Sequence, residues 1–258
     1  IVRKQLFSSK QNTDLEKHRA KLMAKGLPTK KPIIGVEHII LVSSGKGGVG
    51  KSTTADTDVY GPSIPLMMNL HDTPLLNDKN LIMSMGFLID EGSPVIWRGL
   101  MVMQALEKLL RQVDWGSIDY LIVDTPPGTG DTHLSLIQNI PITGVILVTT
   151  PQSAALQVTK RGAVMFQKLS IPIIGLVENM SSVTCSSCSN IVKIFGEGTS
   201  ILASEINSSI IESFPLHQEI SNTTDKGTPI VIKDRESPES KLYINLAKKV
   251  VEFVGNKC

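Results

Sequence analysis

The stretch 45–52 constrains this chain more than any other, because its sequence, Gly-Lys-Gly-Gly-Val-Gly-Lys-Ser, fits the phosphate-loop template G-x-x-x-x-G-K-[ST]. An apolar run at 38–42 precedes it and predicts a buried strand. Glycines let the backbone turn tightly, so that successive N–H groups point at phosphate oxygens. We predict that Lys51 reaches the β- and γ-phosphates of a nucleotide and that the Ser52 hydroxyl binds Mg²⁺. The predicted nucleotide-binding residues here are Gly45, Lys46, Gly47, Gly48, Val49, Gly50, Lys51, Ser52 and Thr53.

A second nucleotide-binding element is predicted where an apolar run, 120–123, ends in Asp124. This is the form of a Walker B element, in which the aspartate holds the hydration shell of Mg²⁺. The turn that follows, Pro126-Pro127-Gly128, fixes the direction of the loop, and the Gly128 N–H is placed to sense a γ-phosphate. We expect His133, farther along, on the surface of a helix.

The rest of the chain predicts an α/β fold with a doubly wound, mostly parallel sheet. Apolar runs at 145–150 and 173–177 are typical of buried strands, and a helical pattern at 154–169 separates them. Strands that alternate with helices favour a parallel sheet. Further helices are predicted over 199–205 and 238–254, the second with an ordinary apolar stripe that should pack on the domain.

Composition excludes several classes of function. The chain has 258 residues, of which 41% are hydrophobic, and a formal net charge of +2. This size suits one α/β domain, and the near-neutral balance does not suggest a nucleic-acid binder. No apolar run approaches the roughly 20 residues that a membrane-spanning helix needs, so we expect no stable membrane insertion.

The chain divides into a basic leader, 1–34, and a predicted nucleotide-binding domain, 35–258. The leader carries nine Lys and Arg residues against only Asp14 and Glu16. Such a basic, acid-poor segment is compatible with the remnant of a mitochondrial transit peptide and equally with a flexible basic arm.

The segment after the phosphate loop is too short for this kind of domain. A phosphate loop should open a helix that leads to another strand, and such a crossover needs at least about 10–12 residues. Here Thr53 is followed almost directly by the string 56–63, Asp-Thr-Asp-Val-Tyr-Gly-Pro-Ser. We infer that roughly 20 residues, a helix and a strand inside the sheet, are missing.

A second chemical centre is predicted at Cys185 and Cys188, whose C-x-x-C spacing can place two sulfurs on one metal. A tetrahedral site needs four ligands, and the only other cysteine is Cys258. If the motif binds metal, two chains must share it, which implies a homodimer. A thiol–disulfide pair, structural zinc across the dimer and an inert pair remain alternatives.

These motifs together resemble a known family. The loop Lys-Gly-Gly-Val-Gly-Lys-Ser is similar to the deviant Walker A loop of the ParA/MinD/nitrogenase-iron-protein class. With Asp-Val-Tyr-Gly-Pro-Ser, Asp-Thr-Pro-Pro-Gly-Thr-Gly-Asp and C-x-x-C in the same order, the chain resembles the Mrp/ApbC family of P-loop iron–sulfur cluster carriers from about residue 33 onward. Within that family it is most similar to the mitochondrial NUBPL-type branch, which supplies clusters to respiratory complex I.

The resemblance implies specific roles for single residues. It implies that Lys46 reaches across a dimer interface to the partner's nucleotide, and that Asp58 orients the attacking water, so both are expected in catalysis. It also implies that Asn179 contacts the adenine base. Cys185 and Cys188 are expected to share a [4Fe–4S] cluster between two subunits.

The hypothesis that follows is an ATP- and Mg²⁺-dependent homodimer in the mitochondrial matrix, with weak ATPase activity, that delivers a [4Fe–4S] cluster to recipient iron–sulfur apoproteins such as complex I subunits. Two alternatives stay open. One is a MinD/ParA-like positioning ATPase without a cluster. The other is an inactive variant, because the missing segment leaves Asp58 close behind the phosphate loop.

Overall fold

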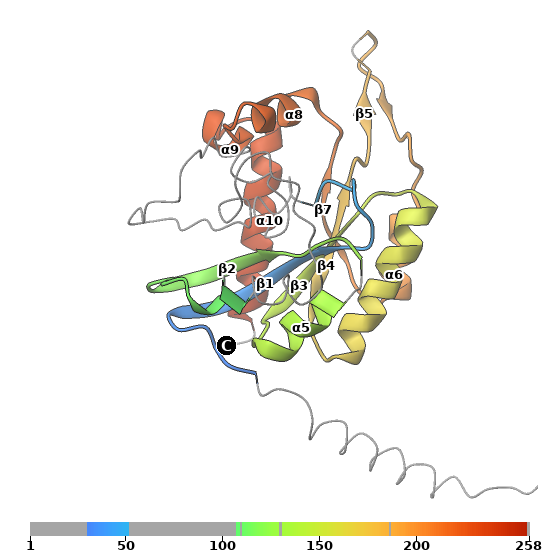
Figure 1. Cartoon of the computed structure of the whole chain (residues 1–258). Coiled ribbons are helices and arrows are strands. Elements are labelled where there is room, and N and C mark those ends of the chain that lie inside the picture. Colours follow the sequence, from blue (N-terminus) through green and yellow to red (C-terminus); the bar gives the residue numbers. More distant parts are fainter. Residues whose placement is uncertain (1–29, 52–106, 109, 129–130, 186, 257–258) are drawn as a thin grey trace, which may run out of the picture.

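A five-stranded parallel sheet forms the centre of the molecule. A computed structural model describes residues 30–51, 107–108, 110–128, 131–185 and 187–256. The strands pair in the order β2-β1-β3-β4-β7, all parallel (Figure 1). Their bounds are β1 (Val36–Ser44), β2 (Ile118–Asp124), β3 (Gly144–Thr149), β4 (Ile173–Asn179) and β7 (Ile210–Phe214). The predicted doubly wound α/β fold is confirmed.

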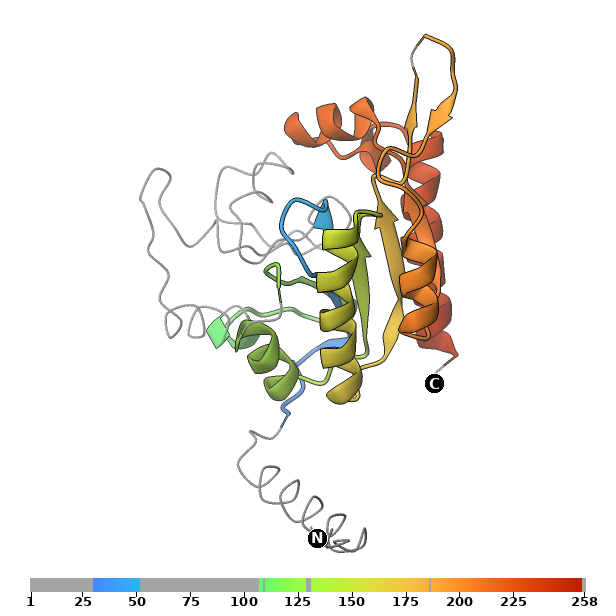
Figure 2. The same ribbon diagram turned by 90° about the vertical axis from the view of Figure 1, so that its right-hand side faces the viewer.

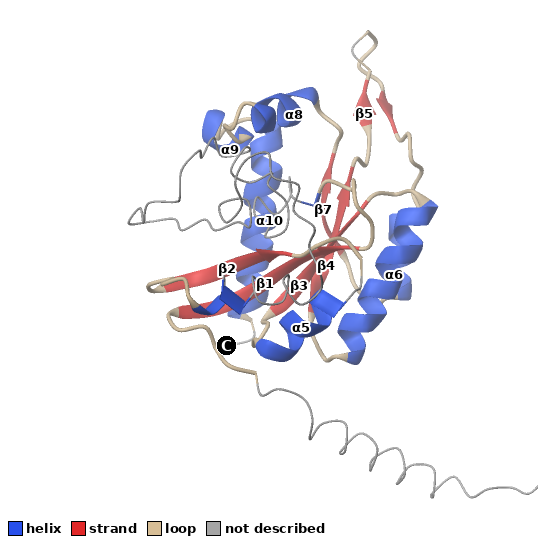
Figure 3. Cartoon of the chain, viewed as in Figure 1, coloured by secondary structure: helices blue, strands red, loops and turns tan. Residues whose placement is uncertain are grey.

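Helices cover both faces of this sheet. One face carries α5 (Asp131–Asn139), α6 (Ser153–Lys168) and α7 (Thr199–Glu205), and α10 (Pro238–Gly255) lies along the other (Figures 2 and 3). The short helices α8 (Gln218–Asp225) and α9 (Ile230–Lys233) precede α10. The helices predicted over 154–169, 199–205 and 238–254 are thus confirmed to within a residue or so at each end.

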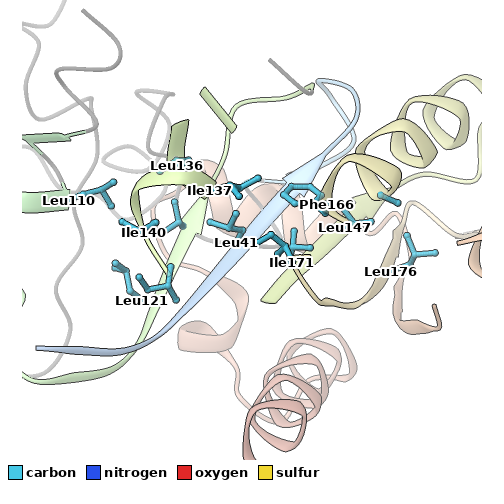
Figure 4. Packing of buried hydrophobic residues seen from close by; sticks show 14 of the residues in the cluster. Leu41, Leu110, Leu121, Leu136, Ile137, Ile140, Leu147, Phe166, Ile171 and Leu176 are labelled. Atoms are coloured by element: carbon cyan, nitrogen blue, oxygen red, sulfur yellow. The ribbon is translucent and has the colours of Figure 1, made fainter. Parts of the chain in front are cut away.

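The buried apolar side chains form two clusters, one on each face of the sheet. Two clusters arise because successive side chains of a strand point to opposite faces. In β1, Leu41 lies in the cluster that contains Phe166 of α6, whereas Ile40 lies in the cluster that contains Leu246 of α10. Figure 4 shows the first of these clusters. Burying each such side chain contributes roughly 1.5–3 kcal/mol, which explains why β1 is apolar on both faces.

The last helix packs on the domain, as its apolar stripe predicts. It begins at a Ser237 cap followed by Pro238, and it buries Leu246, Val250 and Val254 against the sheet. In the part of the chain that the structure describes, no helix combines the length and apolarity that crossing a membrane requires.

The order of the described strands limits where a further strand could pair. They pair without a break, and β1 has β2 on one side and β3 on the other. A further strand can therefore pair with the described sheet only beyond β2 or beyond β7, and the missing strand expected inside the sheet remains a prediction. The apolar run 81–88 predicts a further strand, which lies outside the described residues. The sequence also predicts a helix of about 14 residues from Trp97, of which the structure describes only the end, with helical residues at 107–108 and 110–111.

A small hairpin extends from the same edge of the sheet as the phosphate loop. Its strands are β5 (Val183–Thr184) and β6 (Ile191–Val192), which pair antiparallel. It follows β4 after three residues and projects away from the body of the domain (Figures 1 and 2). The fold thus brings the loop after β1 and the hairpin after β4 to one edge.

Candidate functional site

The phosphate loop follows β1 at the carboxyl edge of the sheet, where parallel α/β folds bind ligands. Its backbone is left-handed at Gly48, with φ of +78°, and at Gly50, with φ of +77°. Lys46 is exposed, as a residue that reaches toward another subunit should be. Gly45 lies against the backbone of α6, and Gly47 lies opposite Pro127. Ser52, Thr53 and Asp58 lie outside the described residues.

The end of β2 brings a carboxylate to the loop. Lys51 and Asp124 form a hydrogen-bonded ion pair, although neither side chain is more than 7% exposed. Transfer of unpaired charges into such a site is unfavourable, so each group stabilises the other. The structure therefore brings together the lysine that is predicted to reach the phosphates and the aspartate that is predicted to hold the hydration shell of Mg²⁺.

The loop after Asp124 is bonded directly to the phosphate-loop strand. The Gly128 N–H donates to the Ser44 carbonyl over 2.9 Å, and the Thr125 N–H donates to the Val42 carbonyl over 3.0 Å. The Gly128 N–H that we predicted to sense a γ-phosphate is thus bonded to protein in this conformation. A phosphate would have to compete with Ser44 for it.

His133 is buried, which corrects the expectation of a surface residue. Only 1% of it is exposed, because α5 directs it inward with Leu136 and Ile137, one turn along the same face. Its Nε2 lies 2.9 Å from the Thr125 Oγ1 and 3.2 Å from the Ser43 Oγ. Sequence reasoning missed this residue, although its spacing from the apolar residues of α5 was a usable signal.

The hydrogen bonds assign the proton of His133. The Thr125 hydroxyl donates to the Val42 carbonyl, so it accepts from the imidazole, and Nε2 carries the hydrogen. No partner for Nδ1 is found among the described residues. Burial, and secondarily the charge of Lys51, lowers the pKa of His133 to about 4. A neutral imidazole therefore joins β1 to the loop after β2.

Asn179, at the end of β4, contacts the phosphate loop itself. Its Nδ2 donates to the Val49 carbonyl over 2.9 Å. A Cβ atom on Gly50 would lie 2.0 Å from the same nitrogen, so only glycine permits this approach. The predicted contact with an adenine base remains a prediction. The side chain lies against the loop's backbone.

The hairpin carries the two cysteines, so the C-x-x-C motif lies in a turn between two strands and does not open a helix. Cys185 is half-buried and Cys188 is exposed. The Cys185 carbonyl accepts from the Ser189 N–H, and its own N–H donates to Asn190, which closes the turn. Backbone N–H groups of Ser187 and then Cys188 donate to the Cys185 sulfur and lower the pKa of that thiol. Such a turn favours the thiolate form, which is the metal ligand.

The described part of a single chain does not complete a metal site at this hairpin. Across the described ranges, no group of three or more His, Cys, Asp or Glu side chains is placed to hold a metal ion. Three apolar residues of the hairpin region, Ile191, Val192 and Ile194, are 71%, 51% and 57% exposed.

Comparison with known proteins identifies relatives over most of the chain. A family model described as "ParA: NUBPL iron-transfer P-loop NTPase" matches residues 54–251. The mouse protein "Iron-sulfur cluster transfer protein NUBPL" is 48% identical over 267 residues, covering 92% of this chain and 84% of the mouse protein. The Arabidopsis thaliana "Iron-sulfur protein required for NADH dehydrogenase, mitochondrial" is 43% identical, covering 89% of this chain and 82% of that protein.

A solved structure is also similar to this chain. The nucleotide-binding protein of Archaeoglobus fulgidus in complex with ADP is 30% identical, with a TM-score of 0.63, and the match covers 80% of this chain and 91% of the other. The alignment with the mouse protein extends over more residues, 267, than the 258 of this chain. The mouse protein therefore has residues within the aligned span that this chain lacks.

Proposed function

Because the chain belongs to the NUBPL iron-transfer family of P-loop NTPases, we propose that it is an ATP-dependent carrier that delivers a [4Fe–4S] cluster to recipient apoproteins. The observation that carries the proposal is the placement of a C-x-x-C turn and a phosphate loop at one edge of the sheet. The cluster is the cargo that the protein transfers, and the nucleotide controls this transfer.

The phosphate loop fits a nucleotide. Two left-handed glycines shape a tight backbone turn, and a Cβ atom on Gly48 would meet no described atom within 4 Å, so that side of the loop is open. Lys51 would exchange its bond to Asp124 for one to the β- and γ-phosphates. Asp124 would then be available to hold the hydration shell of Mg²⁺, together with Ser52. Lys46, which is exposed, would neutralise phosphate charge in a second subunit.

Hydrolysis would use residues of the same loops. Asp58 would orient the attacking water, and the Gly128 N–H would respond to the γ-phosphate. Because Gly128 is bonded to Ser44, loss of that phosphate would let the loop after Asp124 return to the arrangement seen here. We expect this activity to be weak.

The cysteine turn fits a shared cluster. Cys185 and Cys188 supply two sulfurs, and a [4Fe–4S] cluster takes four. Two chains that meet at their hairpins would complete the set about a two-fold axis. The exposed side chains of Ile191, Val192 and Ile194 support this arrangement, since a second hairpin would remove them from water.

The names of the relatives support a proposal for the recipient and for the compartment. A plant relative is named for a requirement of mitochondrial NADH dehydrogenase. We propose that the recipients are complex I subunits and that the protein acts in the mitochondrial matrix, with residues 1–34 as the remnant of its transit peptide. The domain 35–258 would carry all of the chemistry.

Anaerobic reconstitution tests the proposal. The protein is loaded with iron and sulfide, and the bound iron is measured for the unsubstituted chain and for Cys185→Ala and Cys188→Ala. Cys258→Ala serves as the matched control. We expect both turn variants to lose most of the iron and the control to retain it. Iron loading that is unchanged in Cys185→Ala would refute the proposed site.

Thermal unfolding with and without Mg-ATP tests the alternative of an inactive variant. A ligand that binds the native state at about a hundredfold excess over its Kd adds roughly 2.7 kcal/mol of stability. We expect a cooperative transition that Mg-ATP raises, and no increase for Lys51→Met. Absence of a shift in the unsubstituted chain would favour the inactive alternative.

A further inference from the structure

We propose that Asn179 is a positioning residue that couples the phosphate loop to the cysteine turn, so that a nucleotide on the loop controls the accessibility of Cys185 and Cys188. The coupling rests on the proposed function, since it needs a nucleotide at the loop. It adds to that function one residue, Asn179, and the segment after it, which together connect the phosphate loop to the cysteine turn.

The first step of the route is the hydrogen bond from Asn179 to the Val49 carbonyl, 2.9 Å long. The Val49 carbonyl and the Gly50 N–H belong to one planar trans peptide, so they point in opposite directions. By holding the carbonyl, Asn179 fixes the direction of the Gly50 N–H, one of the loop's amides. Phosphate bound to that amide would strengthen the carbonyl as an acceptor, because hydrogen bonds in a chain polarise one another.

The second step is the segment that leads from Asn179 to the cysteines. Cys185 follows Asn179 by six positions along the chain. Between them, Met180 has a left-handed backbone, with φ of +54°, which is unusual for a residue with a side chain. A conformation of this kind persists only where its surroundings hold it in place.

Those surroundings are the bonds between this segment and the end of β7. The Ser181 N–H and Oγ both donate to the Phe214 carbonyl, over 2.9 and 3.1 Å, and the Leu216 N–H donates to the Ser182 carbonyl over 2.8 Å. The segment is therefore a short, fixed connection. A displacement of Asn179 is therefore transmitted to β5 and the cysteine turn, because these bonds leave the connecting segment little freedom to move by itself.

The coupling has two states. In one, Asn179 holds Val49 and the bonds to the end of β7 fix the segment 180–184, whereas in the other the bond from Asn179 is broken and the bonds to β7 loosen with it, which releases the hairpin. A nucleotide that favours the first state lowers the population in which the thiols react, and coupling between two sites is typically about fivefold or more. Bound nucleotide would thus keep the cysteines protected, and its departure would free them.

The test measures the rate at which iodoacetamide alkylates Cys185 and Cys188 in a Cys258→Ser background, with and without saturating ADP and Mg²⁺. The central variant is Asn179→Leu, which is similar in size and has no donor. The matched control is Ser213→Ala, which removes a 3.2 Å bond to Glu178 at the same edge of the sheet and does not involve the phosphate loop. The Kd of ADP is measured for each protein, so that all are compared when saturated.

We expect ADP to slow alkylation by about fivefold in the unsubstituted chain and in Ser213→Ala, and to leave the rate unchanged in Asn179→Leu. Equal slowing in Asn179→Leu would overturn the coupling, as would an unchanged rate in an unsubstituted chain that binds ADP. Failure of that chain to bind ADP at all would contradict the proposed function and remove the coupling with it.

Discussion

Lys51 and Asp124 form a buried ion pair that joins the phosphate loop to the end of β2. The two residues are far apart in the sequence, and the parallel pairing of β1 with β2 brings them together, with Val42 opposite Asp124. In this conformation the ammonium that should bind phosphate neutralises the carboxylate that should hold Mg²⁺. Nucleotide binding therefore exchanges one set of charge pairs for another.

The Lys51–Asp124 pair predicts that removing one of the two charges destabilises the protein more than removing both. Lys51→Met should lower the free energy of unfolding by about 3–5 kcal/mol, because it removes the cation that compensates a buried carboxylate. The double variant Lys51→Met/Asp124→Asn should recover most of that loss, since no charge is left in the site. Urea unfolding of the three proteins makes the comparison, and a single variant as stable as the unsubstituted chain would contradict it.

Two glycines of the phosphate loop should differ in their tolerance of a side chain. Gly48 and Gly50 have nearly the same left-handed φ, so an alanine at either position should cost about 1–2 kcal/mol of strain. At Gly50 the added Cβ atom would also lie 2.0 Å from the Asn179 amide nitrogen. Gly50→Ala should therefore lose about 1–3 kcal/mol more than Gly48→Ala in urea unfolding.

A double variant tests whether the extra loss of stability in Gly50→Ala comes from the contact with Asn179. Because the extra loss is assigned to Asn179, the double variant Gly50→Ala/Asn179→Ala should be only about as unstable as Gly48→Ala once the separate effect of Asn179→Ala is subtracted. Equal losses of unfolding free energy in Gly48→Ala and Gly50→Ala would show that the contact with Asn179 adds no cost at Gly50.

His133 predicts a dependence of stability on pH. Its pKa is about 4 in the folded protein and near 6.5 when unfolded, so acid protonates the unfolded state first. The stability that the neutral imidazole contributes is present above pH 6.5 and is lost as the pH falls toward 4. The loss should approach about 3 kcal/mol in total.

Comparison with His133→Gln isolates this effect, since glutamine does not titrate and other ionisable groups are common to both proteins. The difference in unfolding free energy between the two should shrink as the pH is lowered from 7 to 4.5. A difference that stays constant over this range would mean that the imidazole is not held neutral by burial.

The cysteine turn predicts different reactivities for its two thiols. Backbone N–H groups of Ser187 and Cys188 lower the pKa of Cys185, so this thiol should be alkylated faster at pH 7, although Cys188 is the more exposed. Mass spectrometry of iodoacetamide-treated peptides measures both rates in one protein. Unfolding in urea should equalise them, and equal rates in the folded protein would argue against the hydrogen bonds.

Much of this architecture could be predicted because its signals are local. The strand before the phosphate loop, the strand that ends at Asp124 and the helix over 238–254 each have a hydrophobic periodicity that is complete within one element. The phosphate-loop and C-x-x-C motifs are likewise contiguous, so their residues could be named from sequence.

The failures concern contacts between elements. His133 was expected on the surface because its partners, Ser43 and Thr125, belong to two other segments. The bond between Asn179 and Val49 depends on β4 and β1 both ending at one edge of the sheet. Strand order is likewise a property of the whole sheet, so no single segment specifies the order β2-β1-β3-β4-β7.

Native mass spectrometry of the anaerobically reconstituted protein shows whether two chains share one cluster through Cys185 and Cys188. We expect a species with the mass of two chains and one [4Fe–4S] cluster, which both Cys185→Ser and Cys188→Ser abolish and Cys258→Ser retains. A cluster carried by a single chain, or one that persists in Cys185→Ser, would mean that these cysteines do not hold a cluster between two chains.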